Sequence, residues 1–177
     1  MATVTVTSRP EEVRAAERIV LPGQGAMPDC MRSLAEHGLG EAVARAAADK
    51  PFLGLCIGQQ MLFEGSDEGD TAGLGLLMGR VRGFPRRDGL KVPHMGWNQL
   101  NVRRPSPLLK HLPEGAGVYF VHSYYVEPAD EDVVATTTDY GRPFCSSIWR
   151  DNVMATQFHP EKSQTVGLGM LADFANL

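Results

Sequence analysis

The chain has 177 residues, 43% of them apolar and 21% charged, with a formal net charge of −4, which is ordinary for one globular domain. The acidic balance, without any dense run of Lys and Arg, argues against nucleic-acid binding. No apolar stretch approaches the ~20 residues that a membrane-spanning helix needs. Three widely spaced cysteines suggest neither a disulfide framework nor a zinc site. We therefore expect a cytoplasmic protein that holds no metal ion.

The first half of the chain alternates between predicted strands and predicted helices. Alternating or continuous apolar residues predict strands at Thr3–Thr7, Arg18–Leu21 and Pro51–Leu55. Helix-forming residues predict one helix capped by Asp29, one over Glu41–Ala48 and one over Gly58–Glu64. This alternation is typical of an α/β domain built around a largely parallel sheet.

The second half of the chain favours antiparallel strands. Apolar stretches predict strands at Val118–Val126, Val133–Thr138 and Phe144–Trp149, and turn residues separate the last two runs from their neighbours. A closing helix is predicted over Ser163–Phe174, with Ser163 as its cap. We therefore expect one domain over residues 1–177, whose mixed sheet is parallel at its centre and antiparallel at one edge.

The segment Gly54-Leu55-Cys56-Ile57-Gly58 carries the clearest chemical signal. It lies between a predicted buried strand and a predicted helix, which is the setting of a nucleophile elbow, here with cysteine in place of serine. Glycine at positions 54 and 58 avoids collisions where a sharp turn brings backbone segments together. The turn places the Cys56 sulfur at a helix N-terminus, where the helix dipole favours the thiolate. The pattern favours a nucleophile over a buried structural cysteine.

A cysteine nucleophile needs a base, and His159-Pro160-Glu161 offers one. Pro160 disfavours helical geometry at His159, so the segment is expected to be extended. Residues two apart in an extended chain point to the same side, which lets the Glu161 carboxylate accept a proton from one imidazole nitrogen. The other nitrogen then faces Cys56, as in a catalytic triad. Taken alone this triplet is more often structural, and the elbow reverses that reading.

Attack on a carboxamide creates an oxyanion, which needs two N–H donors aimed at it. In an elbow fold one donor is the N–H after the nucleophile, here that of Ile57. The other comes from a loop after a neighbouring strand, and the Gly-rich segment Gly23-Gln24-Gly25 is placed to supply it from Gln24 or Gly25. A plain tight turn is the alternative for this loop.

Other candidates carry weaker signals. Gln60 lies four residues after Cys56 on the same predicted helical face, where its amide could hold a substrate. His94 and His122 are possible alternative bases, although each is more often a structural histidine. The two cysteines outside the elbow, Cys30 and Cys145, have no adjacent base and are interpreted as inert.

These motifs together resemble those of the class I, or triad, glutamine amidotransferases. The resemblance is carried by Gly54-Leu55-Cys56-Ile57-Gly58-Gln59-Gln60 and by His159-Pro160-Glu161. Within that family, the segments 93–98, 119–124 and 159–163 resemble the glutaminase subunits of imidazole glycerol phosphate synthase, an enzyme of histidine biosynthesis. The resemblance implies a three-layer, flavodoxin-like α/β fold with a mixed, mostly parallel central sheet and an antiparallel edge.

The resemblance also implies an enzyme that hydrolyses glutamine to glutamate and ammonia, with no cofactor. A barrel-shaped cyclase subunit, the partner in a heterodimer, would receive the ammonia and use it on a phosphoribulosyl formimino carboxamide nucleotide. The implied residue roles are nucleophile (Cys56), general base and acid (His159), orienting carboxylate (Glu161), oxyanion hole (Gly23, Gln24 and Ile57), glutamine site (Gln60 and Glu64) and cyclase-facing surface (Trp97, Asn98 and Lys162).

The chain departs from the family at its N-terminus. Family members open with a strand that bears an Asp-Tyr-Gly-type motif, then a loop and a helix, and this sequence has none of them. We therefore expect an N-terminally incomplete chain, with a gap or an unpaired edge between the strand near Thr3 and the strand that ends at Leu55. Three alternatives stay open: an unrelated Cys-His-Glu hydrolase, the glutaminase subunit of another amidotransferase, and a non-catalytic chain that only docks the cyclase.

Overall fold

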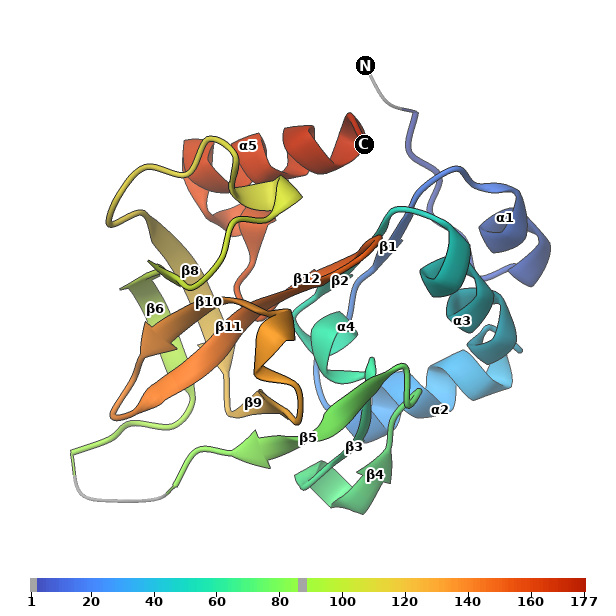
Figure 1. The fold of residues 1–177 in the computed structure, drawn as a ribbon. Coiled ribbons are helices and arrows are strands. Elements are labelled where there is room, and N and C mark those ends of the chain that lie inside the picture. Colours follow the sequence, from blue (N-terminus) through green and yellow to red (C-terminus); the bar gives the residue numbers. More distant parts are fainter. Residues whose placement is uncertain (1–2, 86–88) are drawn as a thin grey trace.

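A computed structural model describes residues 3–85 and 89–177 (Figure 1). The α-helices of these residues are α1 (Pro10–Ala15), α2 (Met27–Glu36), α3 (Gly40–Asp49), α4 (Ile57–Gln60) and α5 (Gln164–Ala175). Their strands are β1 (Ile19–Leu21), β2 (Phe52–Leu55), β3 (Phe63–Ser66), β4 (Thr71–Ala72), β5 (Leu77–Gly83), β6 (His94–Gln99), β7 (Asn101–Val102), β8 (Gly117–His122), β9 (Tyr124–Pro128), β10 (Val134–Asp139), β11 (Pro143–Arg150) and β12 (Val153–Thr156).

One large mixed sheet organises the described chain. Its order is β1-β2-β12-β11-β9-β5-β3-β4, with β10 against β11 and β7 against β10. The neighbours β1, β2 and β12 run parallel, as do β3 and β5, while β11 runs antiparallel to both β12 and β9. The strands β6 and β8 form a separate antiparallel pair. The expected α/β fold with a mixed sheet is therefore confirmed.

Alternate residues of the parallel strands supply two different cores. Phe52 of β2 packs in the cluster that contains the apolar faces of α1, α2 and α3, whereas its neighbour Leu53 packs in a second cluster. That second cluster includes Phe120 of β8 and both Met170 and Phe174 of α5. Figure 1 shows the same arrangement, with α1, α2 and α3 on one side of the sheet and α5 beside β8 on the other. β2 and β12 are therefore buried on both faces, whereas β1 buries only one and leaves Val20 46% exposed.

The strand predicted at Thr3–Thr7 is wrong. This segment has no strand structure, and its Val4 and Val6 side chains are 83% and 97% exposed. Alternating Thr and Val cannot form a strand without a neighbouring strand to bond with and a core face to bury. β1 pairs directly with β2 without a gap, and no described strand pairs with the other edge of β1. The unpaired edge thus lies at the margin of the sheet and not inside it.

Two further predictions have wrong boundaries. The helix expected over Gly58–Glu64 lasts only one turn, because the chain turns at residues 61–62 and enters β3. The strand expected over Val118–Val126 is interrupted at Ser123, so that β8 pairs with β6 while β9 joins the large sheet. In both cases a continuous apolar run hides a change of direction that only the packing of the whole domain requires.

Of the two expected caps, Asp29 is wrong, and Ser163 is right in position only. α2 begins at Met27, so Asp29 lies inside its first turn, where its charge still complements the helix dipole. Ser163 stands at the N-cap position of α5 but makes no capping bond. Its hydroxyl donates to the carbonyl of His159 (2.6 Å) and accepts from the Tyr119 N–H (3.0 Å). Ser163 therefore ties the segment around His159 to β8.

Candidate active site

Three loops leave the sheet side by side, at the carboxyl ends of β1, β2 and β12. Leu21, Gly54 and Ala155 form one row across these strands. Beyond that row, the Cys56 N–H donates to the carbonyl of Thr156 at 2.8 Å. The loops that follow hold the candidate oxyanion donors, the candidate nucleophile and the candidate base. Parallel strand order thus gathers residues that lie far apart in the sequence, at the edge where α/β proteins usually bind ligands.

Cys56 occupies the backbone conformation of a nucleophile elbow. Its φ is 54° and its ψ is −108°, a strained combination for a residue with a side chain. A Cβ at Gly58 would overlap the carbonyl oxygen of Leu21, and one at Gly54 would lie 2.8 Å from the carbonyl oxygen of Gly58. The two glycines therefore permit the close approach that the sequence suggested.

The Cys56 thiol is buried and protonated at neutral pH. Burial raises its pKa to about 11, and the negative charge of Glu161 acts in the same direction. The Ile57 N–H and the amide of Gln157 oppose this rise, since both donate toward the sulfur. A thiol with this pKa needs a base within reach before it can attack a carbonyl.

His159 has the orientation that a base requires. Its Nδ1 lies 2.7 Å from Oε1 of Glu161, so the carboxylate fixes the proton on Nδ1. Its Nε2 is buried and has no hydrogen-bond partner among the described residues, which leaves that nitrogen free to accept a proton. The His159 N–H donates to the Tyr119 carbonyl at 2.9 Å, and Ser163 holds the His159 carbonyl. The segment therefore fixes the imidazole from both sides.

The loop after β1 packs directly on the elbow. A Cβ at Gly23 would lie 2.7 Å from Cβ of Ile57 and 3.0 Å from the backbone nitrogen of Gly58. Only glycine allows this approach, which brings the loop against the first turn of α4. Gly23 and Ile57, both predicted around an oxyanion hole, are thus in contact.

The peptide between Gln24 and Gly25 has a defined direction. The Gln24 carbonyl accepts from the Cys30 thiol at 3.4 Å, so the Gly25 N–H points the opposite way in the trans peptide. Within the described chain, the N–H groups of Gln24 and Gly25 have no protein acceptor. Gly25 has φ of +88° and open space around it. The loop therefore offers free donors and can reorient.

Gln60 lies in the same buried network as Cys56. Its Nε2 donates to the Tyr124 carbonyl at 3.1 Å and to Oε1 of Gln157 at 3.0 Å. Gln157 in turn directs its Nε2 to the Cys56 sulfur at 3.6 Å. The structure thus brings Gln60 to the nucleophile through one intermediate side chain.

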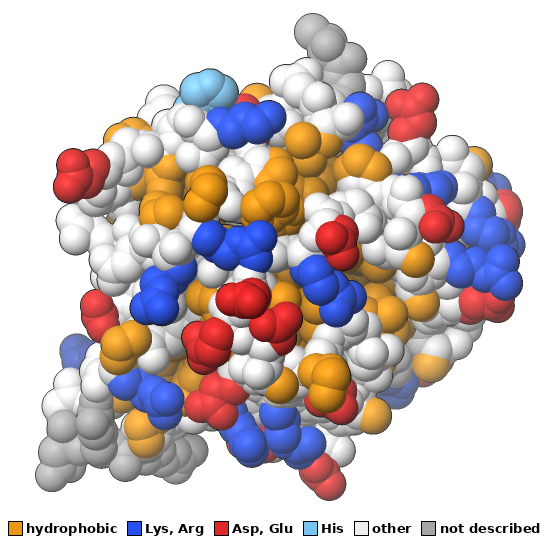
Figure 2. Space-filling view, in the orientation of Figure 1, with side chains coloured by type: hydrophobic (Ala, Val, Ile, Leu, Met, Phe, Trp, Pro, Cys, Tyr) orange, Lys and Arg blue, Asp and Glu red, His pale blue; other side chains and the backbone are white. Residues whose placement is uncertain are grey.

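Glu64 is placed differently from Gln60. Its carboxylate accepts from the Gly79 N–H at 2.8 Å and lines a pocket with Arg80, Arg82 and Glu127. Figure 2 shows acidic and basic side chains mixed over this part of β5 and β9. The described contacts do not join Glu64 to Cys56, so its assignment to the glutamine site rests on the family resemblance alone.

The alternative bases His94 and His122 are unsuited to that role. Burial lowers the pKa of His94 to about 4 and that of His122 to about 3. Their rings hydrogen-bond each other, Nδ1 of His94 to Nε2 of His122, at 2.9 Å. The remaining nitrogens contact Asn98 (3.2 Å) and the Tyr124 carbonyl (2.8 Å). With every nitrogen occupied, these histidines hold the β6–β8 pair to β9.

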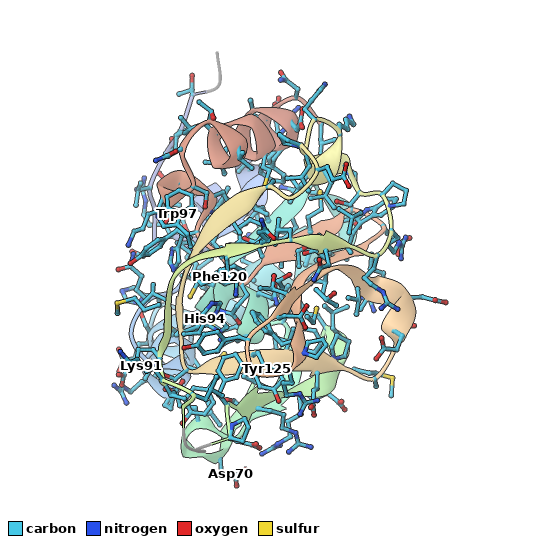
Figure 3. The ribbon with its side chains drawn as sticks, turned by 90° about the vertical axis from the view of Figure 1, so that its left-hand side faces the viewer. Asp70, Lys91, His94, Trp97, Phe120 and Tyr125 are labelled. Atoms are coloured by element: carbon cyan, nitrogen blue, oxygen red, sulfur yellow. The ribbon has the colours of Figure 1, made fainter. Side chains whose placement is uncertain are left out.

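The three residues predicted to face a cyclase differ in exposure and contacts. Trp97 is 52% exposed on β6 and lies edge-on to the Tyr119 ring of β8. Asn98 points inward and hydrogen-bonds His94, while Lys162 is exposed in the 3₁₀ turn after His159. Figure 3 shows His94 beside Phe120, with Trp97 farther along the same strand. Trp97 and Lys162 therefore offer exposed groups, and Trp97 lies against Tyr119, whose carbonyl accepts from the His159 N–H.

Two participants were not identified from the sequence. Gln157 precedes Phe158 and the predicted base, and it had no separate motif of its own. The Tyr124 carbonyl is a backbone atom, which carries no sequence signal. Alternation could not have indicated Gln157, because residues 157–158 bend and Pro160–Lys162 form a 3₁₀ turn, so the extended segment expected around His159 does not form.

The described residues show neither a metal cluster nor a helix suited to a membrane. They contain no group of three or more His, Cys, Asp and Glu side chains that could hold a metal ion. Each helix in residues 3–85 and 89–177 is too short or too polar to cross a membrane.

Comparisons with known proteins agree with this geometry. The family model "Glutamine amidotransferase class-I" matches residues 2–176. A curated relative from Aromatoleum aromaticum, the imidazole glycerol phosphate synthase subunit HisH, is 57% identical and covers 97% of this chain and 84% of its own. The HisH subunit from Syntrophotalea carbinolica is 52% identical and covers 97% and 87%.

Solved structures share the fold at low sequence identity. A putative GMP synthase protein from Thermoplasma acidophilum superposes with a TM-score of 0.70 at 18% identity, covering 95% of this chain and 75% of its own. A structure described as a glutamine amidotransferase superposes with a TM-score of 0.67 at 18% identity, covering 97% and 85%. These likenesses show the fold.

Proposed function

Because this chain belongs to the class I glutamine amidotransferase family, we propose that it is the glutaminase subunit of an imidazole glycerol phosphate synthase. The observation that carries the proposal is the elbow at Cys56, joined by a backbone hydrogen bond to the strand end that leads to His159, whose Nδ1 is held by Glu161. Relatives named as the HisH subunit of that enzyme, at 52–57% identity over 97% of the chain, support the choice within the family.

The proposed reaction begins with proton transfer from Cys56 to Nε2 of His159. The thiolate attacks the amide carbon of glutamine, and the carbonyl oxygen becomes an oxyanion. His159 then returns the proton to the departing nitrogen, which leaves as ammonia and leaves a thioester. Water, deprotonated by His159, adds to the thioester and releases glutamate and the Cys56 thiol. Glu161 stabilises the imidazolium that forms twice in this cycle.

The oxyanion would be held by backbone N–H groups of the two loops in contact. The Ile57 N–H lies at the start of α4, next to the sulfur, where the helix terminus favours negative charge. The Gln24 and Gly25 N–H groups belong to the loop that packs on Ile57 through Gly23. In this proposal Gln60 and Glu64 contact the glutamine substrate.

The ammonia would pass to a cyclase subunit that docks on the face carrying Trp97, Asn98 and Lys162. Exposed apolar side chains on β6, Met95 at 62% and Trp97 at 52%, favour such a protein contact. Docking there also shields the site, because ammonia that escapes becomes ammonium and is no longer a nucleophile. We place the complex in the cytoplasm, a proposal supported by three cysteines that remain free thiols. We also treat residues 1–177 as one amidotransferase domain, in line with the family match over 2–176.

The test is to measure glutamate and ammonia released from glutamine by the purified chain, alone and with the cyclase subunit and its nucleotide. We expect turnover that requires Cys56 and is highest in the loaded complex. If the chain bound the cyclase but hydrolysed no glutamine, it would be a non-catalytic docking subunit, and the proposed glutaminase activity would be refuted. If the rate of glutamine hydrolysis did not change with the cyclase but rose with the synthase subunit of another amidotransferase, the chain would belong to that other enzyme.

A further inference from the structure

One backbone carbonyl receives hydrogen bonds from both sides of the candidate active site. The oxygen of Tyr124 accepts from Nε2 of Gln60 at 3.1 Å and from Nδ1 of His122 at 2.8 Å. A carbonyl oxygen can only accept, so each partner must present an N–H to it. Tyr124 therefore fixes which end of the Gln60 amide and which nitrogen of His122 carries hydrogen.

The donor and acceptor order set by the Tyr124 carbonyl extends through two side-chain amides to the Cys56 sulfur. The same Nε2 of Gln60 lies 3.0 Å from Gln157, which must then offer its Oε1 as acceptor. The other end of the Gln157 amide is an NH₂ group, and it lies 3.6 Å from the Cys56 sulfur. Both N–H groups of Gln60 are thereby used, and its Oε1 is left without a protein donor among the described residues.

The chain of contacts is shielded from water at its centre. Gln60 is 2% exposed and Gln157 is fully buried. Turning either amide around would set two acceptors or two donors against each other in a site where an unmatched polar group is costly. On the other side of the Tyr124 carbonyl, His122 hydrogen-bonds His94, and His94 hydrogen-bonds Asn98. The donor and acceptor order therefore extends to β6.

We propose that Gln157 is a positioning residue of the glutaminase reaction, which presents an N–H to the Cys56 sulfur and holds Gln60 with its Oε1 toward the substrate. Only the part that concerns Gln60 and the substrate rests on the proposed function. An N–H directed at sulfur favours the thiolate, and the Gln157 amide does lower the pKa of Cys56. A Gln60 fixed in this way would accept a hydrogen bond from an N–H group of glutamine and could not donate one.

Two variants separate the two contacts of Gln157. Gln157→Met keeps the shape and removes both contacts, whereas Gln157→Glu keeps an acceptor for Gln60 and removes the N–H at the sulfur. The matched control is Gln59→Met, because Gln59 is equally buried on α4 and its amide has no hydrogen-bond partner among the described residues. Each full-length protein is alkylated with iodoacetamide across a pH series, and labelling of the Cys56 peptide is followed by mass spectrometry.

Both Gln157 variants are expected to raise the midpoint of Cys56 alkylation by about half a pH unit or more, while Gln59→Met leaves it unchanged. In glutamine hydrolysis, Gln157→Met is expected to raise KM about tenfold or more, and Gln157→Glu to lower kcat with a smaller change in KM. Unchanged alkylation midpoints in both Gln157 variants would overturn the proposal, even if their thermal stability fell. Because alkylation needs no glutamine, an inactive wild-type protein would refute the proposed function and still leave the sulfur contact tested.

Discussion

At the scale of single residues, Cys56 combines an unfavourable backbone conformation with an unfavourable protonation state for attack. Its φ of 54° costs energy for any residue with a Cβ, and burial raises the thiol pKa to about 11. Neither property helps the domain to fold. Both are consistent with a residue that is retained for chemistry, because strained and perturbed groups concentrate at functional sites.

The strain at Cys56 predicts that an inactive variant is more stable than the natural chain. Cys56→Gly is expected to raise Tm by a few degrees, since glycine adopts positive φ without a Cβ penalty of about 1 kcal/mol. Differential scanning calorimetry of the two proteins checks this. A lower Tm for Cys56→Gly would mean that packing around the sulfur outweighs the backbone strain.

Only one of the three cysteines is expected to be essential. Cys56→Ala should reduce glutamine hydrolysis by a factor of about 10³ or more, the usual loss when one member of a triad is removed. Cys30→Ala and Cys145→Ala should keep most of the activity, although Cys30 contacts the Gln24 carbonyl. Steady-state release of glutamate measures all three. Substantial turnover by Cys56→Ala would refute the assignment of the nucleophile.

Substitutions of His159 and Glu161 are expected to lower the rate of glutamine hydrolysis to different extents. His159→Ala removes the group that moves the proton, whereas Glu161→Gln keeps a hydrogen-bond acceptor beside Nδ1 and loses only the charge. The rate should therefore fall less in Glu161→Gln than in His159→Ala. Circular dichroism controls for folding, and the opposite order in two folded variants would contradict the roles.

At the scale of secondary-structure elements, the β6–β8 pair is held in place by neutral histidines. Its inner side stacks His94 on Phe120 with ring centroids 4.7 Å apart, and His122 reaches from β8 to the first residue of β9. The outer side carries Trp97. Burial keeps both rings uncharged at neutral pH.

The protein is therefore expected to lose stability in mild acid. The pKa values of His94 and His122 are about 4 and 3 in the folded chain against 6.5 when exposed, so the unfolded state binds more protons between these values. The free energy of unfolding should be fully present above pH 6.5 and fall as the pH drops toward 4, by about 1.4 kcal/mol for each unit of pKa difference.

Urea unfolding at pH 7.5, 6.0 and 5.0 measures this slope. The double variant His94→Gln/His122→Gln should show a much smaller slope, and the exposed His37→Gln should match the natural chain. Equal slopes in the natural chain and the double variant would show that these histidines do not control acid stability.

How well an element could be predicted depended on whether its signal was local. The Ala-rich α3 and the apolar β2 carry their own signals, and the structure confirms both to within two residues. The segment 118–126 reads as one strand, but its two halves belong to different sheets, because Ser123 lies where the domain changes direction. Alternation at Thr3–Thr7 predicted a strand that has no partner.

The site followed the same rule. The elbow was predictable because glycine at 54 and 58 meets its backbone requirement, and the contact of His159 with Glu161 was predicted as well. The expected extended backbone was wrong, since Pro160–Lys162 form a 3₁₀ turn. The role proposed for Gln157 was not predictable, since it depends on the direction of an amide that the Tyr124 carbonyl sets from another strand. Motifs indicated which residues meet, but not the donor and acceptor order among them.

At the scale of the whole molecule, glutamine hydrolysis is expected to depend on the partner. The peptide between Gln24 and Gly25 can present its N–H or its C=O to the oxyanion, and a C=O pointing inward would repel the negative charge. Binding of the cyclase and its nucleotide would favour the N–H arrangement. Rates of glutamate release should therefore be higher in the loaded complex than in the free subunit, and equal rates would contradict this.

The row formed by Leu21, Gly54 and Ala155 also has an evolutionary consequence. Each reactive group follows this row after only a few residues. Adding or deleting one residue in any of the three spacers would therefore displace that group by up to about 3.3 Å. Selection should therefore hold the lengths of these spacers constant among descendants, even where their amino acids change. Insertions and deletions should accumulate in connections far from the row, such as that between β7 and β8.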